Sequence, residues 1–298
     1  MTRAIPARLN LCLLFACSLA AAGLLCYASH ATSWPGLALA ALAFSYCNHT
    51  LYALLHEAVH SALHPNARVN AWGGRLAAAF FPTAFRLQKA FHLNHHRNNR
   101  GPSEQWDYIR PGDNRWLKLA QWYAILTGLY WLFIPAGALL FLVFPSLLRS
   151  RFLTESASAR QTAADSYSEA IQNLGLGARL EVLGTLAFQV ALFWLLDLNW
   201  SGWLLCYAAF AVNWGSLQYA DHAFSPLDVR EGAWNLRTHP WVRRLLLNYP
   251  LHKAHHRHPN LSWIHLPDCV DPNEPQPSYL EQWLKMWRGP QPMPREDT

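Results

Sequence analysis

The chain has 298 residues, of which 52% are hydrophobic and only 14% are charged. Ordinary soluble domains carry about 25% charged residues, so this composition indicates a membrane protein. The net charge of +6 does not indicate nucleic-acid binding, because the 24 Lys and Arg residues flank long apolar segments, as they do in the cytoplasmic loops of membrane proteins.

The apolar segments predict membrane-spanning helices arranged as two hairpins. A helix needs about 20 apolar residues to cross a bilayer, and four spans are expected at about 9–28, 35–55, 180–196 and 203–219. The short turns within the pairs, 29–34 and 198–202, contain no Lys or Arg, so we expect both turns outside the cell. We therefore predict an all-α fold, a polytopic membrane helical bundle that forms a single domain over residues 1–298.

A further apolar segment, 119–148, lies between the two pairs. The loop after it, 149–179, carries four arginines and is expected on the cytoplasmic side, so segment 119–148 must cross the membrane an even number of times. Thirty residues are too few for two full spans, and Pro135 and Gly137 near the middle favour a kink or turn. We predict a membrane-buried hairpin that does not cross. A single tilted span is the alternative, and it would place loop 149–179 outside.

The remaining segments are polar or amphipathic. Residues 56–118 and 220–285 are expected to form a histidine-rich cap on the cytoplasmic side. The last ten residues, 289–298, contain three prolines and predict a disordered tail.

Three histidine clusters carry the chemistry. Residues three and four apart share one face of a helix, so each cluster can direct two or three imidazoles at one point. Neutral imidazole is a good ligand for iron, zinc, copper and nickel, and eight clustered histidines exceed what one metal ion accepts. The clusters are His56/His60, His92/His95/His96 and His252/His255/His256.

Two other histidines are candidates. His222 follows the last predicted span, with Gln218 one turn before it, and both could face the same centre. His64 continues the four-residue spacing of His56 and His60, but we favour an ordinary polar role for it.

Two interpretations of the metal site compete. The segment His56-Glu57-Ala58-Val59-His60 matches the HExxH pattern of zinc hydrolases, with Glu57 as general base, and would suit a membrane metalloprotease. That interpretation leaves six clustered histidines unexplained. A dinuclear centre uses all clusters, and its nitrogen-rich ligand set favours iron and O₂.

The order and spacing of these clusters resemble the integral-membrane fatty acid desaturase superfamily, which has one HxxxH box followed by two HxxHH boxes. Gln218 and His222 resemble an additional ligand element of the family. Asn248-Tyr-Pro-Leu-His252 resembles the usual lead into the third box. The resemblance covers about residues 35–270.

The resemblance implies a non-haem diiron centre with two iron ions and O₂ as co-substrate. Its ligands would be His56, His60, His92, His95, His96, His222, His252, His255 and His256. Polar groups that could orient the ligand imidazoles are Glu57, Asn94, Asp107, Gln218 and Asp221.

The implied activity is desaturation of an acyl lipid, acyl-CoA or acyl-carrier substrate, with hydroxylation of a lipid or hydrocarbon chain as the alternative. The sequence lacks the HPGG signature of a fused cytochrome b5 domain, so electrons are expected from a separate ferredoxin, rubredoxin or cytochrome b5 type of donor. We expect the protein among the lipids of a bacterial inner membrane, with its active site facing the cytoplasm.

Overall fold

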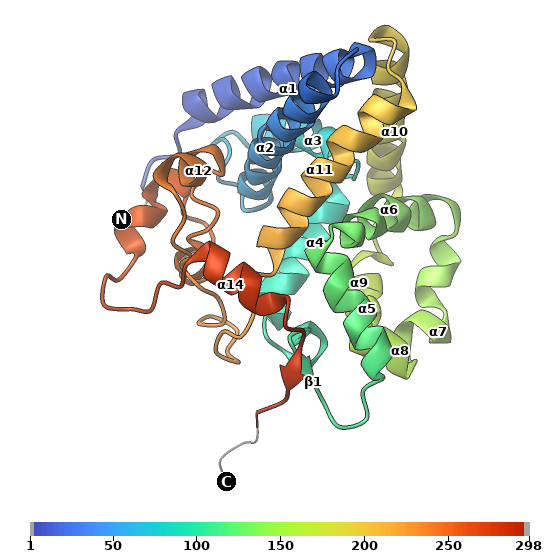
Figure 1. Cartoon of the computed structure of the whole chain (residues 1–298). Helices are drawn as coiled ribbons and strands as arrows, with labels where there is room; N and C mark the ends of the chain where they lie inside the picture. The colour runs from blue at the N-terminus through green and yellow to red at the C-terminus, as the bar shows by residue number, and fades with distance from the viewer. Residues whose placement is uncertain (1–2, 295–298) are drawn as a thin grey trace.

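A computed structural model of the chain describes residues 3–294 and shows an all-α architecture (Figure 1). The helices of ten or more residues are α1 (Ala7–His30), α2 (Trp34–Val59), α3 (Ala67–Phe80), α4 (Phe85–Asn98), α5 (Arg115–Leu126), α6 (Phe133–Val143), α10 (Leu176–Leu195) and α11 (Trp200–Gln218). The shorter α-helices are α7 (Arg151–Thr154), α8 (Ala157–Thr162), α9 (Ala164–Ile171), α12 (Pro240–Leu245), α13 (His252–Arg257) and α14 (Tyr279–Met286). Four 3₁₀ helices are η1 (Pro102–Glu104), η2 (Leu129–Leu132), η3 (Pro145–Arg149) and η4 (Trp263–Cys269).

Three of the described helices are long and apolar enough to cross a membrane: α1, α2 and α10. They coincide with three of the four predicted spans. The fourth predicted span is helical, as α11, but does not meet the same combined criterion of length and hydropathy. The expectation of an all-α helical bundle is confirmed, while the number of crossings remains a prediction.

The two predicted hairpins lie side by side. In Figure 1 the α1–α2 turn and the α10–α11 turn meet at the upper right of the molecule. The Asn199 side-chain amide donates a hydrogen bond to the Ser29 carbonyl across these turns. A Cβ on Gly202 would come within 2.7 Å of the Ala28 backbone, so glycine permits the close approach of α11 to α1. Both turns therefore lie at the same end of the bundle.

Segment 119–148 bends at a different place from the one predicted. The chain turns by 95° between α5 and the following helical segment, which begins at Leu129. The turning residue is Gly128, with φ +80°, where a Cβ would come within 2.5 Å of the Ala211 carbonyl carbon. Pro135 occupies the first turn of α6, a position that a helix tolerates, so it does not break the helix. The geometry is a right-angled bend and not the antiparallel hairpin that we expected.

The segment that follows α6 packs against the start of α5. The Gln161 side chain in α8 donates to the Asn114 carbonyl at 2.8 Å and accepts from the Asn114 N–H at 2.9 Å. Helix α9 also packs against α4, through Ser166 and Asn94, whose side chains lie 2.7 Å apart. The chain after the bent pair therefore returns to the start of α5 and to α4, while whether segment 119–148 crosses the membrane remains a prediction.

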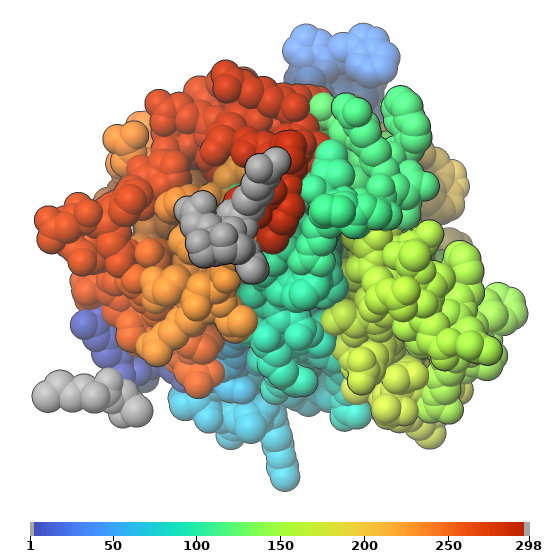
Figure 2. Space-filling model, turned by 90° about the horizontal axis from the view of Figure 1, so that it is seen from below, coloured from blue at the N-terminus to red at the C-terminus, as the bar shows by residue number. Residues whose placement is uncertain are grey.

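The end of the bundle opposite the two short turns is covered by the remaining segments. Figure 2 shows this face, with the green segment near residue 100, the yellow-green segment near 160 and the orange to red segment after 225. Strand β1 (Tyr108–Ile109) pairs in parallel with β2 (Gln291–Pro292). Part of the tail that we expected to be disordered is thus a strand, and residues 295–298 lie outside the described residues.

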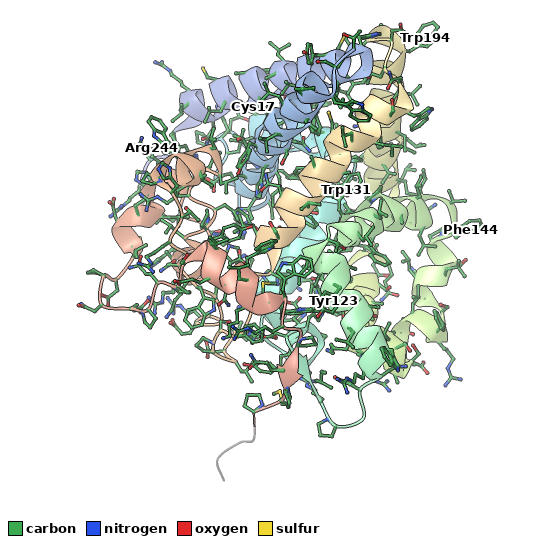
Figure 3. All side chains as sticks on the ribbon, viewed as in Figure 1. Cys17, Tyr123, Trp131, Phe144, Trp194 and Arg244 are labelled. Atoms are coloured by element: carbon green, nitrogen blue, oxygen red, sulfur yellow. The ribbon has the colours of Figure 1, made fainter. Side chains whose placement is uncertain are left out.

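Large apolar side chains project outward from the helices. Figure 3 labels Trp194 at the far end of α10 and Phe144 after α6, and both point away from the protein. They are 88% and 57% exposed. Such exposure in water would be costly for aromatic side chains, whereas it suits contact with lipid.

Candidate metal centre

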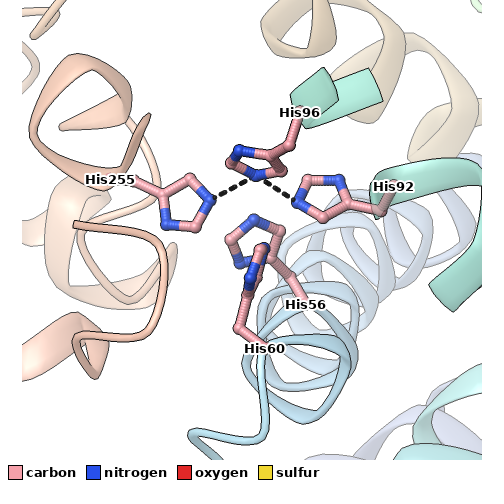
Figure 4. Close-up of side chains that lie close together, drawn as sticks. All are labelled: His56, His60, His92, His96 and His255. Carbon is pink, nitrogen blue, oxygen red and sulfur yellow. Dashed lines mark hydrogen bonds between the residues drawn. The ribbon is translucent and has the colours of Figure 1, made fainter. Parts of the chain in front are cut away.

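The nine predicted ligand histidines come together as two adjacent groups. Group one contains His56, His60, His92, His96 and His255, and group two contains His95, His222, His252 and His256. Within each group, one nitrogen from each imidazole lies within 4.8 Å of the corresponding nitrogens of the others. Figure 4 shows group one, with His56 and His60 from α2, His92 and His96 from α4, and His255 from α13.

Helical spacing decides which histidine joins which group. Residues four apart share a helix face, whereas neighbours differ by about 100°. His92 and His96 accordingly both point into group one, while His95 points into group two. In the third cluster His252 and His256 join group two, and His255 joins group one. The sequence neighbours His95 and His96 thus supply one imidazole to each group, and so do His255 and His256. These two dipeptides link the groups and keep them adjacent.

The nitrogens of group one are arranged as a cradle for a cation. His96 Nε2 lies 3.0 Å from His92 Nε2 and 3.0 Å from His255 Nε2 (Figure 4). One ring nitrogen carries a single proton or a single lone pair, so it cannot satisfy both contacts as ordinary hydrogen bonds. Within residues 3–294, the His56 and His60 Nε2 atoms are buried without a hydrogen-bond partner, as are the Nε2 atoms of His222 and His256 in group two. Buried imidazole nitrogens that converge in this way fit a metal ion in each group.

Burial keeps these imidazoles in the neutral, metal-binding form. It lowers the pKa of His60 to about 4, with Lys89 and His95 contributing less. Burial, followed by neighbouring histidines, also lowers the pKa of His92, His96, His255 and His256 well below the usual range. The nitrogen lone pairs are therefore available at neutral pH.

In group two, other protein groups lie beside the second nitrogen of three of the four rings. His95 Nδ1 lies 2.6 Å from the buried Glu104 carboxylate. His222 Nδ1 lies 2.8 Å from the Gly232 carbonyl, so it donates there and leaves Nε2 for the metal. His252 Nδ1 lies 3.5 Å from the Asp221 carboxylate. Hydrogen bonds such as those of His95 and His222 fix the tautomer and the orientation of ligand imidazoles.

The five side chains expected to orient the ligands have different roles in the structure. Asp221 does lie beside His252 and His222, and burial raises the pKa of its carboxyl group well above the usual value. The other four make no hydrogen bond to a histidine. Glu57 accepts hydrogen bonds from Ser262 and the Trp263 N–H, and Asn94 bonds to Ser166 and Asn98. Asp107 accepts from Arg100, Tyr219 and the Phe224 N–H. Gln218 donates to the Tyr249 hydroxyl.

No pattern in the sequence pointed to Glu104 or Gly232 as partners of the histidines. Glu104 lies in η1, nine residues after His95, and only the turn at 99–101 brings its carboxylate back to α4. His64 does not join either group, since its Nδ1 accepts from the Asn66 N–H at 2.9 Å at the start of α3.

The HExxH interpretation does not account for this geometry. The Glu57 carboxylate is only 4% exposed and accepts hydrogen bonds from Ser262 at 2.8 Å and from the Trp263 N–H at 3.1 Å. His56 and His60 are also surrounded by three further imidazoles, which leaves no reason to treat the pair as an isolated site.

Comparison with known proteins agrees with the geometry. No curated protein matches the chain. The sequence does match the family model of the fatty acid desaturases over residues 32–287, a range that contains all nine histidines of the two groups and the helices that carry them. A match over most of the chain, together with this histidine-box site, shows that the protein belongs to the fatty acid desaturase family.

Proposed function

We propose that this protein is an O₂-dependent acyl-chain desaturase that holds one iron ion in each histidine group. The observation that carries the proposal is the convergence of nine buried or half-buried imidazoles into two adjacent groups in a member of this family. Two iron ions in these groups would supply the activation of O₂ and the removal of hydrogen from an unactivated methylene.

The protein's own residues hold the metals and position the substrate. The histidines would provide the ligand nitrogens, and Glu104, Asp221 and the Gly232 carbonyl would orient group two. A small pocket lies against His56, Glu57, His252 and His255, and its other walls are formed by Ala53, Leu247, Tyr249, Trp263 and Leu266. This largely apolar wall suits a methylene group and excludes water from the histidines.

The substrate would be an acyl lipid, an acyl-CoA or an acyl-carrier conjugate, and a separate protein would supply electrons. Exposed arginines lie next to the histidines, since Arg97 follows His96 and Arg230 lies in the loop between His222 and His252. Such cations favour an acidic carrier of the ferredoxin, rubredoxin or cytochrome b5 type. The proposed location is a bacterial inner membrane, with the histidines facing the cytoplasm.

Mass spectrometry of acyl lipids tests the proposal. Cells that express the protein in air are compared with cells that express His255→Ala or His258→Ala. His258 is exposed and joins neither group, so it is a matched control on the same segment. We expect a loss of two hydrogens from an acyl chain with the wild type and with His258→Ala, and none with His255→Ala.

A gain of one oxygen that requires His255 would instead identify a hydroxylase on the same scaffold. An unchanged lipid profile, when the test is repeated with each of the three donor types and with purified, iron-loaded protein, would overturn the proposal.

A further inference from the structure

A second candidate binding site lies on the flank of the bundle, away from the histidines. It is a groove of about 630 Å³ between α3, the start of α4 and the first half of α10. Its apolar wall is formed by Leu76, Ala79, Phe85, Leu180 and Phe188. The inner end is closed by a hydrogen bond of 2.8 Å from Thr185 Oγ1 to the Thr83 carbonyl.

One end of this groove is charged. Glu181 is nearly buried and binds Arg75 at 2.8 Å and Arg86 at 3.2 Å. The Arg86 side chain is 51% exposed and the Arg75 side chain 29%. Two guanidinium groups share one carboxylate, so the end of the groove keeps one net positive charge and has N–H donors free of Glu181. Arginine is well suited to phosphate, because it can donate two parallel hydrogen bonds.

The charged end of the groove lies near one end of a candidate membrane-spanning helix. Helix α10 is one of the three helices able to span a membrane, and the charged residues lie near its Leu176 end, away from the α10–α11 turn. Trp72 borders the groove, is 69% exposed and stacks against Arg75 with 4.8 Å between the guanidinium carbon and the ring centroid. Exposed Trp beside Arg is typical of the membrane interface.

We propose that this groove binds one anionic glycerophospholipid of the surrounding bilayer as a resident lipid. The phosphate contacts Arg75 and Arg86, and one acyl chain lies along Leu180, Gly184 and Phe188. Basic pockets beside membrane helices bind anionic headgroups through the same chemistry. The inference concerns binding alone and does not depend on the metal centre or on turnover.

Two substitutions test the two halves of the site. Gly184 borders the groove, and a Cβ there meets no atom within 4 Å, so the first atom of a side chain fits and Gly184→Leu is expected to extend into the acyl path. Gly23 in α1 is equally unobstructed, which makes Gly23→Leu the matched control. Arg86→Gln removes one charge but leaves Glu181 paired with Arg75 and with the Arg86 backbone N–H.

The full-length protein is equilibrated in mild detergent with equal amounts of phosphatidylglycerol and phosphatidylcholine of identical acyl chains, and native mass spectrometry counts the lipid retained. We expect the wild type and Gly23→Leu to retain one phosphatidylglycerol in preference to phosphatidylcholine. Arg86→Gln should weaken phosphatidylglycerol binding about fivefold, the value of one interfacial arginine. Gly184→Leu should lower retention of the lipid to about a tenth or less, since its side chain occupies the acyl path.

Two results would overturn the inference. One is equal retention of the two lipids by the wild type. The other is wild-type retention of phosphatidylglycerol by Gly184→Leu. A thermal unfolding curve for each variant shows that a loss of lipid does not reflect loss of the fold.

Discussion

The two histidine groups are built in different ways. Group one takes two pairs of histidines, each four residues apart, from α2 with its C-cap and from α4, and a fifth histidine, His255, from α13. Among the described residues, its imidazoles hydrogen-bond only to one another. Group two takes its histidines from α4, α13 and the loop after α11, and Glu104, Asp221 and Gly232 lie against their second nitrogens. Helix packing therefore shapes group one, whereas hydrogen bonds and a buried carboxylate shape group two.

The largest effect is expected from removing one ligand of either group. His96→Ala removes an imidazole from group one, and His222→Ala removes one from group two. Because both metals are needed for the proposed chemistry, each variant should retain less than about 1% of the product formed by the wild type. The iron content of the purified variants, measured by metal analysis, should fall from two ions per chain toward one.

His258→Ala is the control for both substitutions, and it should keep both iron ions. Full activity of either ligand variant would contradict the assignment of that histidine.

The second prediction separates the groups. Glu104→Ala leaves His95 Nδ1 without its partner at 2.6 Å, and it also removes the acceptor of the Tyr167 hydroxyl. Loss of such an outer partner typically weakens metal affinity by about 10–100-fold. Titration with a chelator should then remove the two iron ions in separate steps, with group two emptied first. The exposed Glu169 in α9 provides the control Glu169→Ala, and simultaneous loss of both irons from Glu104→Ala would show that the groups are not held independently.

The third prediction tests whether helix packing determines the positions of the histidines in group one. A Cβ on Gly74 would come within 2.6 Å of the Phe85 ring and 3.0 Å of Ala58 Cβ, so Gly74→Ala would push α3 away from α2 and α4. Overpacking of this kind costs about 1–3 kcal/mol. Thermal unfolding should show a lower Tm, and chelation should remove the iron of group one before that of group two.

Gly137→Ala is the matched control for Gly74→Ala, because its Cβ meets open space. A Tm for Gly74→Ala equal to that of Gly137→Ala would contradict the packing argument.

The smallest effect is expected for Glu57→Gln. Its side chain lies next to group one in sequence, yet its carboxylate binds Ser262 and Trp263. A glutamine oxygen can accept the same hydrogen bonds, so the free energy of unfolding should fall by less than about 1.5 kcal/mol. Product formation should remain within about tenfold of the wild type in the acyl-lipid assay. Complete loss of product formation, with both iron ions retained, would instead indicate a catalytic role for the Glu57 carboxylate.

The sequence was enough to predict which histidines form the site, because the helical periodicity that places them on one face depends only on residues a few positions apart. The spacing of four places two imidazoles of each cluster on one helix face, and the number of clustered histidines indicates a site for more than one metal ion. The helical bundle was predictable for a similar reason, since long uncharged apolar runs form membrane helices with satisfied backbone groups. The computed helices α1, α2 and α10 lie within a few residues of the predicted spans.

Other features depended on contacts between distant residues and had no local signal. The bend at Gly128 is set by the close approach of α11, which no pattern within 119–148 records, and the proline and glycine further along misled the prediction. Of the five polar side chains expected to orient the histidines, Asp221 lies within 4 Å of two of them, whereas the described hydrogen bonds of the other four go to different residues, because a polar side chain near a ligand in sequence can turn toward any neighbour. Sequence alone therefore determined which residues could bind metal and on which helix face they lie. Tertiary structure alone decided how they divide into two groups, since that division depends on how α2, α4 and α13 meet.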